Sequence, residues 1–373
     1  MTAYLDHAAT TPLRPEALEA MLPYLTEHYG NPSGAHRVSG LARLAVDQAR
    51  DTVAECLGAQ PGEVVFTGGG TESDNLALSG VRAKRPGAVV CTTVEHHAVL
   101  HTTEALGGRA VPVDGDGVVD RDRLCDSLDE DVSGVSVMLA NNEVGVIEPL
   151  DEVASIVRRK APGAALHTDA VQAFLWLDVA ALAAPADLVA VSAHKFGGPK
   201  GVGALVVRGG TEVGPIIHGG GQERDRRSGT HNVAGIVGMA AAMRATVAER
   251  TTMVERVRTL RDRLADGLAD AIHGTTETVA RHRKVAGSCH LRFEGVESEA
   301  LLVLLDDAGI CASAGSAFAS GAMEPSHVLT AMGGDRVDAL SSLRLSMGTT
   351  TTDDDVDLAL KMVPDSVARL REG

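Results

Sequence analysis

The chain has 373 residues and a formal net charge of −16, and aromatic residues make up only 2% of it. Its core must therefore consist mostly of Ala, Val and Leu, which suits helices on a parallel sheet, and its acidity argues against nonspecific binding to nucleic acid. No apolar run of 18 residues predicts a membrane span, and the N-terminus MTAYLDHAAT lacks a signal-peptide pattern. The five cysteines are scattered without zinc-like spacing, which predicts reduced thiols in a cytoplasmic protein. They are Cys56, Cys91, Cys125, Cys289 and Cys311.

The first 60 residues predict an arm followed by two helices. Residues 1–13 contain a turn at Thr10–Pro12, and a helix is expected to begin near Pro15. After a loop rich in turn residues, Gly30–His36, apolar residues recur at helical spacing from Leu41 to Leu57.

From Glu63 onward, short apolar runs alternate with helical patterns. Polar side chains gather where successive runs end, which is typical of a mainly parallel sheet between helices. Gly203–Val207 is expected to form a hairpin with the run that ends at Val191. The other strands are predicted at Val64–Thr67, Ala88–Thr93, Val135–Ala140, Ala165–Ala170 and Leu188–Val191.

The pattern changes after the loop His218–Thr230 and a long helix predicted over Val233–Ala271. A smaller α+β unit should follow. We expect a large domain over residues 14–250 and a small domain over residues 251–373, which the arm 1–13 joins. The expected elements of the small unit are strands near Ser288–Phe293, Gly309–Ser313 and Ser342–Met347, a helix near Ser298–Ala308 and a terminal helix.

Lys195 is the first candidate catalytic residue. The apolar run Leu188–Val191 ends in Ser192, His194 and Lys195, and a glycine-rich turn follows. Ligands bind at the carboxyl ends of strands in open α/β sheets, and a lysine desolvated there can act as a nucleophile toward an aldehyde. The alternative is a loop lysine at the surface, although the chain has only six lysines against 28 arginines.

Other candidates are weak singly and informative together. Phe66–Asn75 reads as a strand, a glycine turn and a helix start that could hold a phosphate, or as an ordinary connection. Asp169 ends an apolar strand and needs a cationic partner, which could be a protonated ring nitrogen or an arginine. Arg344 could bind a carboxylate or form a surface ion pair. With Lys195, these groups meet the needs of pyridoxal phosphate (PLP) and an amino-acid substrate.

The sequence resembles the cysteine desulfurases of the NifS/IscS kind in the class V aminotransferase family. The resemblance covers nearly the whole chain, and its motifs follow one another in the same order. It implies the type I fold of PLP-dependent transferases. This α/β fold has a mainly parallel sheet of the seven-stranded type between helices, and a small α+β C-terminal domain. The motifs are YLDHAATTP, GNPSGAH, FTGGGTESDN, VEHHAV, NNEVGV, HTDAVQ, SAHKFGGPKGVGAL, HGGGQERDRRSGT, AGSAFASGAMEPSHVL and LRLSMG.

The same resemblance implies a role for individual residues. Lys195 would be the Schiff-base lysine, Asp169 would pair with the pyridinium nitrogen and Gln172 with the ring hydroxyl. His96 would stack on the ring and move protons, and Asn142 and Arg344 would bind the substrate. The phosphate would be held by Gly70, Thr71, Ser192 and His194, and by Thr230 of a neighbouring subunit, which implies a homodimer.

One departure from the family concerns the reaction itself. Relatives carry a cysteine in a segment SGSACTS that takes the substrate's sulfur as a persulfide, whereas this chain has Phe318 there. Cys311 is a weak substitute because a strand cysteine is usually a core residue. A smaller departure is Thr349, where relatives often have arginine.

Three functions therefore remain open. They are a desulfurase-family enzyme acting on L-cysteine or a related β-substituted amino acid, a β-eliminating C–S lyase, and a PLP-binding scaffold for a sulfur-acceptor or biosynthetic partner.

Overall fold

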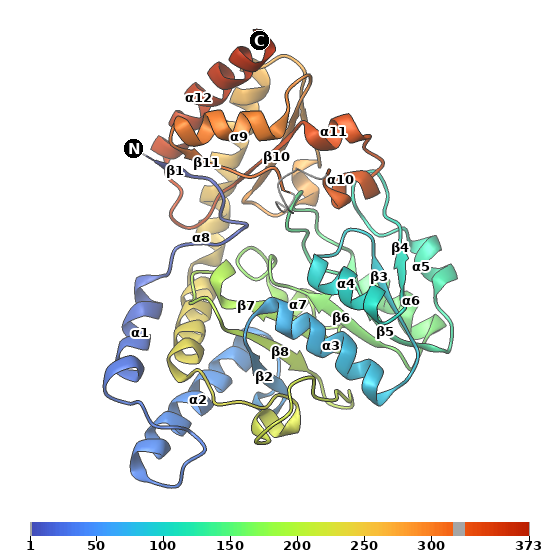
Figure 1. Cartoon of the computed structure of the whole chain (residues 1–373), viewed down its shortest axis with the longest axis vertical. Coiled ribbons are helices and arrows are strands. Elements are labelled where there is room, and N and C mark those ends of the chain that lie inside the picture. Colours follow the sequence, from blue (N-terminus) through green and yellow to red (C-terminus); the bar gives the residue numbers. More distant parts are fainter. Residues whose placement is uncertain (1, 316–324, 373) are drawn as a thin grey trace.

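The computed structural model describes residues 2–315 and 325–372, so Phe318 lies outside the described residues. The chain forms a seven-stranded sheet enclosed by helices and a separate three-stranded sheet with helices of its own (Figure 1). None of the helices in the described ranges combines the length and the hydropathy that a membrane span requires.

The large sheet has the strand order β2-β8-β7-β6-β5-β3-β4. Neighbouring strands are parallel except that β8 runs antiparallel to both β2 and β7, so the predicted hairpin is confirmed. The mainly parallel α/β sheet predicted from the sequence is therefore correct. Its strands are β2 (Val64–Thr67), β3 (Ala88–Thr92), β4 (Arg109–Val111), β5 (Val132–Ser136), β6 (Ala165–Asp169), β7 (Leu188–Ser192) and β8 (Gly203–Val207).

Two corrections concern the strands of this large sheet. The edge strand β4 was not predicted, because it has only three residues and two of them are exposed. The strand predicted over Val135–Ala140 begins and ends earlier, as β5. Val137 and Leu139 still donate backbone hydrogen bonds to His167 and Asp169 of β6, so the apolar run continues beside the sheet after the regular strand ends.

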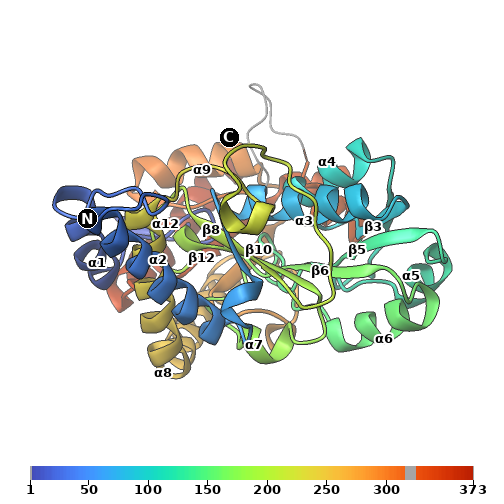
Figure 2. The same cartoon turned by 90° about the horizontal axis from the view of Figure 1, so that it is seen from below.

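Helices cover both faces of this sheet because its strands alternate their side chains (Figure 2). Leu188 and Ala190 of β7 pack in one apolar cluster with α3, whereas Val189 and Val191 belong to the main core on the opposite face. The helices are α2 (Arg37–Cys56), α3 (Gly70–Lys84), α4 (His97–Ala105), α5 (Arg121–Ser127), α6 (Leu150–Lys160) and α7 (Val179–Leu182).

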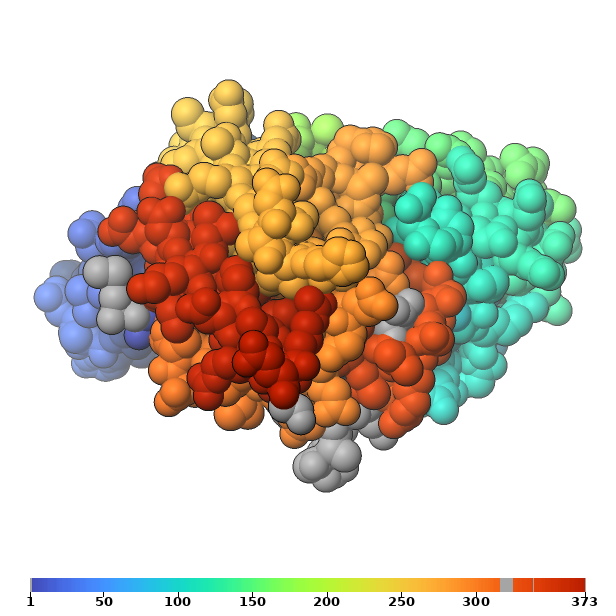
Figure 3. Space-filling view, turned by 90° about the horizontal axis from the view of Figure 1, so that it is seen from above, coloured from blue at the N-terminus to red at the C-terminus, as the bar shows by residue number. Residues whose placement is uncertain are grey.

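Helix α8 (Val233–Ala271) has 39 residues and the bounds that the sequence predicts. It contacts α1 (Pro15–Thr26) and α2 beside the large sheet, and α12 (Asp353–Glu372) in the C-terminal unit. Figure 3 shows α12 and the second half of α8 side by side. Because α8 runs through residue 250 without a break, the domain boundary there stays a prediction.

The C-terminal unit contains a small antiparallel sheet, and the arm reaches it as β1 (Ala3–Tyr4), which pairs in parallel with β11 (Ile310–Cys311). The sheet consists of β9 (Thr275–Glu277), β10 (Ser288–Phe293) and β12 (Ser342–Ser346). The remaining helices are α9 (Ser298–Asp307), α10 (His327–Ala331) and α11 (Arg336–Leu340). The described residues also form short 3-10 turns, which are η1 (Pro61–Glu63), η2 (Ala193–Lys195), η3 (Gln222–Asp225) and η4 (Arg281–Arg283).

Candidate active site

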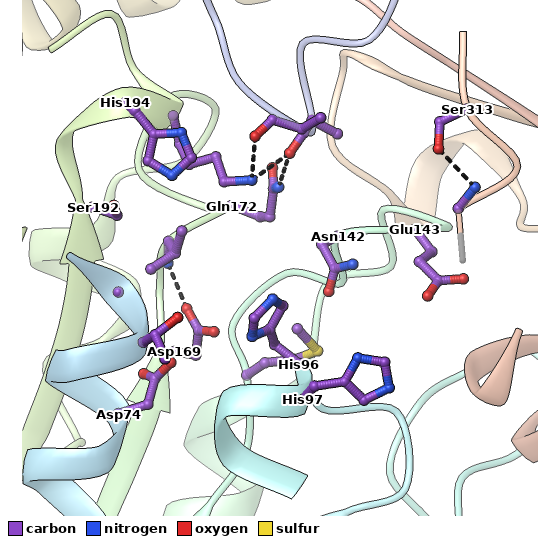
Figure 4. Close-up of a pocket in the computed structure, with 18 of the residues that line it drawn as sticks. Asp74, His96, His97, Asn142, Glu143, Asp169, Gln172, Ser192, His194 and Ser313 are labelled. Carbon is purple, nitrogen blue, oxygen red and sulfur yellow. Dashed lines mark hydrogen bonds between the residues drawn. The ribbon is translucent and has the colours of Figure 1, made fainter. Parts of the chain in front are cut away.

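A cavity of about 410 Å³ lies at the carboxyl ends of the central strands, between the large sheet, the N-terminal arm and the C-terminal unit (Figure 4). It brings together side chains that are far apart in the sequence. All the predicted PLP and substrate residues line it except Thr230. They are Gly70, Thr71, His96, Asn142, Asp169, Gln172, Ser192, His194, Lys195 and Arg344.

Lys195 follows β7 in the turn η2, and its Nζ donates to the backbone oxygens of Ala8 at 2.5 Å and Ala9 at 3.0 Å. Burial, together with the nearby charge of Arg344, lowers the pKa of Lys195 to about 8, although the carboxylate of Asp169 opposes the change. A larger fraction of this lysine is therefore neutral near physiological pH than of an exposed lysine, as a nucleophilic amine requires.

The start of α3 forms an anion cradle beside Ser192. Gly69, which precedes the helix, has φ 149° and offers no capping side chain, so the first amides of the helix remain available to a ligand. A Cβ on Gly70 would lie 2.9 Å from Val171 Cγ2 and 3.5 Å from Ser192 Cβ, so glycine keeps this space open. Burial and the charge of Lys195 lower the pKa of His194 to about 4, which makes its ring a neutral hydrogen-bonding group.

Asp169 ends β6 at the floor of the cavity, and its Oδ1 accepts the amide hydrogen of Val171 at 2.8 Å. Burial raises its pKa to about 6, and the hydrogen bond from Val171 and the charge of Lys195 partly oppose the shift. Asp74 lies beside it in Figure 4, and burial and the charge of Asp169 raise the pKa of Asp74 too. Within the described ranges no cation forms an ion pair with Asp169. A protonated ring nitrogen would supply the missing positive charge, so these residues fit PLP.

His96 is the residue before α4, and its Nδ1 accepts the amide hydrogen of Ala98 at 3.1 Å. Burial, Lys195 and His97 lower the pKa of His96 to about 4. The ring is therefore neutral, and the bond at Nδ1 assigns the proton to Nε2. Figure 4 shows His96 and Asn142 facing the same cavity.

Arg344 is buried on β12, which excludes the surface ion pair considered above as an alternative. Its Nη1 donates to the backbone oxygen of Asn142 at 3.0 Å, and its Nη2 donates to Asp6 Oδ1 at 2.8 Å. Gln172 is also bound to the arm, since its Nε2 donates to the Ala8 oxygen at 2.6 Å.

The remaining residues of the sequence prediction are Thr230, Phe318, Cys311 and Thr349. Thr230 is exposed and does not line the cavity of its own chain. Phe318 lies outside the described residues. Cys311 pairs with Tyr4 in the β1–β11 ladder and does not line the cavity, so no thiol from the described part of the chain replaces the family's cysteine there. The backbone oxygen of Thr349 accepts a hydrogen bond from Arg256 at 2.7 Å.

Several lining residues were not predicted. Asp74, Glu143 and the arm residues Ala8 and Ala9 line the cavity, and so do His97, Ser313 and His327. Asp74 and Glu143 stand inside FTGGGTESDN and NNEVGV, so those motifs contained the signal. Ala8 and Ala9 contribute through backbone oxygens, and because every residue type has such an oxygen, the sequence gives no signal for them.

Comparisons with known proteins find similar sequences and structures along nearly the whole chain. The family model described as Aminotransferase class-V matches residues 3–359. The chain is 43% identical to "Cysteine desulfurase IscS" of Methanosarcina thermophila, over 99% of this chain and 92% of that protein. It is 45% identical to "IscS-like cysteine desulfurase" of Mycobacterium tuberculosis, over 99% and 97%. A solved structure of a "NifS-like protein" superposes with a TM-score of 0.93 at 38% identity, over 99% and 100% of the two chains. Another, "SspA in complex with cysteine", gives a TM-score of 0.78 at 30% identity, over 94% and 100%.

Proposed function

The chain belongs to the class V aminotransferase family and, within it, to the PLP-dependent cysteine desulfurases of the IscS/NifS kind, and on that premise we propose that it cleaves the C–S bond of L-cysteine or a related β-substituted L-amino acid. The observation that carries the proposal is that Lys195, Asp169 and Arg344 converge on one cavity. Asp169 and Arg344 are buried and Lys195 is partly buried, and each of the three has a different task.

The cofactor, when bound, withdraws electrons from the substrate's Cα. The chain's residues would hold it by the α3 amides with Ser192 and His194, and by Asp169 at the ring nitrogen. Lys195 Nζ can move a proton at Cα, since burial lowers its pKa to about 8 and brings it near the operating pH. His96 covers the same cavity with a neutral ring.

The substrate is proposed from Arg344 and from one relative. A buried guanidinium recognises a carboxylate, because the positive guanidinium and the negative carboxylate attract each other strongly in a site without water. The similar protein SspA was solved in complex with cysteine, which supports L-cysteine as the first substrate to test.

The sulfur has two fates that the products distinguish. Desulfuration transfers sulfur to a thiol, which becomes a persulfide, and leaves alanine. β-Elimination uses water and yields pyruvate, ammonia and sulfide. Phe318 in place of the family's cysteine, and Cys311 outside the cavity lining, favour an external thiol or elimination over a persulfide on the protein itself.

The test supplies L-cysteine to the purified holoenzyme, with and without an added thiol, and measures alanine, pyruvate and sulfide. We expect turnover that Lys195→Ala abolishes and that the exposed control Lys160→Ala retains. Phe318→Cys should add a persulfide detectable on the protein by mass spectrometry. If protein that contains PLP forms no product from any amino acid, the enzyme hypothesis is refuted and the scaffold hypothesis remains.

We further propose a homodimer in which Thr230 reaches the neighbouring subunit's site. Several large apolar residues of α1 and α2 are exposed, including Leu22 and Leu44 at 48% and 55%. Such an apolar face is typical of a surface that another chain covers. A hollow of about 830 Å³ also adjoins Gly70 and Ser192 and could admit a partner's loop. Analytical ultracentrifugation tests the dimer, and a monomer at micromolar concentration would refute it; a sulfur-acceptor protein is a further partner to seek.

A further inference from the structure

The N-terminal arm is built into the active site at several points. Ala8 and Ala9 accept hydrogen bonds from Lys195, and Ala8 also accepts from Gln172. Thr10 Oγ1 lies 3.2 Å from His194 Nδ1, and the Thr11 amide donates to the His194 oxygen. The arm therefore directly contacts Lys195, the proposed Schiff-base lysine, and His194, one of the proposed phosphate-binding residues.

Asp6 makes the arm's contact with Arg344. Its Oδ1 accepts from Arg344 Nη2 at 2.8 Å across 338 residues of sequence, and the side chain of Arg344 is 7% exposed. The Asn142 oxygen holds Nη1 of the same guanidinium, whereas Nε has no partner among the described residues. Asp6 and the backbone of Asn142, which are far apart in the sequence, thus each bind one of the two terminal nitrogens of the guanidinium.

Asp6 is itself held in place. Tyr4 Oη donates to the Asp6 backbone oxygen at 3.2 Å, and the Ala8 amide donates to Ser346 Oγ at 2.9 Å. Asp6 also forms a bridge with Ser346, which stands two residues after Arg344 on β12. The carboxylate and the guanidinium are therefore attached to adjacent backbone segments, so their relative orientation cannot vary freely.

We propose that Asp6 is a positioning residue for the substrate carboxylate: it orients the Arg344 guanidinium, so that the N–H groups not bound to Asp6 or Asn142 remain for the substrate. A carboxylate bound to one side of a guanidinium limits its rotation and leaves other donors of the planar fork in a fixed direction. The inference rests on the proposed function, because it assumes that Arg344 binds the substrate's carboxylate.

The alternative is that Asp6 competes with the substrate for Arg344. The two ideas predict opposite effects when Asp6 loses its charge. If Asp6 orients the arginine, Asp6→Asn weakens the binding of carboxylates. If it competes, the same change strengthens that binding.

The experiment measures carboxylate selectivity by isothermal titration calorimetry of the holoenzyme, as the ratio of affinities for L-alanine and for ethylamine, which lacks the carboxylate. Asp6→Asn should reduce this ratio about tenfold, the effect of losing one charge-assisted hydrogen bond. Arg344→Ala should reduce it at least as much, and the double variant should lose no more than Arg344→Ala alone. Glu249→Gln is the matched control, because Glu249 forms an ion pair with Arg14, the first residue after the arm.

The outcomes separate this inference from the proposed function. An unchanged ratio in Asp6→Asn overturns the inference alone, provided that Arg344→Ala lowers the ratio, and an increased ratio shows competition. No preference for L-alanine in the unaltered protein overturns both. PLP content, measured by absorbance, checks that each variant is folded. If Asp6→Asn does not accumulate, Asp6→Glu keeps the charge at a different length and should give an intermediate ratio.

Discussion

Glu223 should be the most important single carboxylate for the stability of the loop that carries Thr230. Its side chain is 1% exposed and receives two hydrogen bonds from Arg50, at 2.8 and 2.6 Å, and one from the Phe66 amide. Glu223 Oε1 also lies 2.6 Å from His231 Nε2. These contacts hold a strained segment, because Glu223, Arg224 and Asp225 all have positive φ.

The size of the effect follows from the pKa of Glu223. Burial alone would raise it, but His231 and Arg50 outweigh burial and lower it from 4.5 to about 2. The charged form is thus favoured in the folded state by about 3 kcal/mol. Since this pKa is lowered on folding, the stabilisation is complete above pH 4.5 and is lost as the pH falls toward 2.

Glu223→Gln should therefore lower the free energy of unfolding by about 3 kcal/mol at pH 7, and by about 1 kcal/mol less at pH 4. Urea titration followed by circular dichroism measures both values. Glu152→Gln is the control, because Glu152 pairs with Arg121 at the surface, where both side chains are 55% exposed, and the loss there should stay below about 1 kcal/mol. Equal losses in the two variants would refute the reasoning.

Two further predictions concern the anion cradle and a buried acid. Gly70→Ala should weaken PLP binding to the apoenzyme about tenfold, because the new Cβ meets Val171 at 2.9 Å, whereas Gly40→Ala, with no atom within 4 Å, should not; equal affinities in a fluorescence titration would contradict the cradle. Glu148 accepts the Val119 amide through Oε2, has no partner for Oε1 among the described residues, and has its pKa raised by burial to about 8. Glu148 keeps its proton to a higher pH in the folded protein than in the unfolded chain. Its contribution to the free energy of unfolding is therefore complete below pH 4.5 and is lost as the pH rises to 8. Glu148→Gln should remove this loss, which is at most about 1.4 kcal/mol per pH unit, and parallel urea-unfolding profiles between pH 5.5 and 8 would contradict the assignment.

Sequence periodicity predicted the elements whose residues share one environment. The run Leu188–Val191 is buried on both faces, so its apolar pattern identified β7, and α8 was bounded at both ends by changes in composition. The edge strand β4 was missed because it has only three residues and two of them, Arg109 and Ala110, are exposed, so it forms no apolar run in the sequence. An apolar run also cannot show where regular strand geometry stops, which is why the predicted end of β5 was wrong.

The candidate site was predictable where chemistry depends on side-chain type. Lys195 and Asp169 were found because a lysine and a carboxylate that follow or end apolar strands are costly to bury, and Arg344 was found because a charged residue stands on an apolar, strand-like run. The backbone oxygens of Ala8 and Ala9 were not predictable, since any residue type supplies them. Asp6 stood in a quoted motif, but its partner lies at the opposite end of the chain, and only the fold reveals that contact.

The contact between Asp6 and Arg344 also has a consequence for biosynthesis. Asp6 leaves the ribosome among the first residues and Arg344 among the last. The contact between them can therefore form only after nearly the whole chain has been synthesised. Loop-closure entropy grows slowly, and a loop of this length costs only about 0.6 kcal/mol more than one half as long. The delay is therefore mainly one of time, because contacts between distant residues form late in folding. A nascent chain that has folded only its large sheet does not yet contain the complete site for the amino acid.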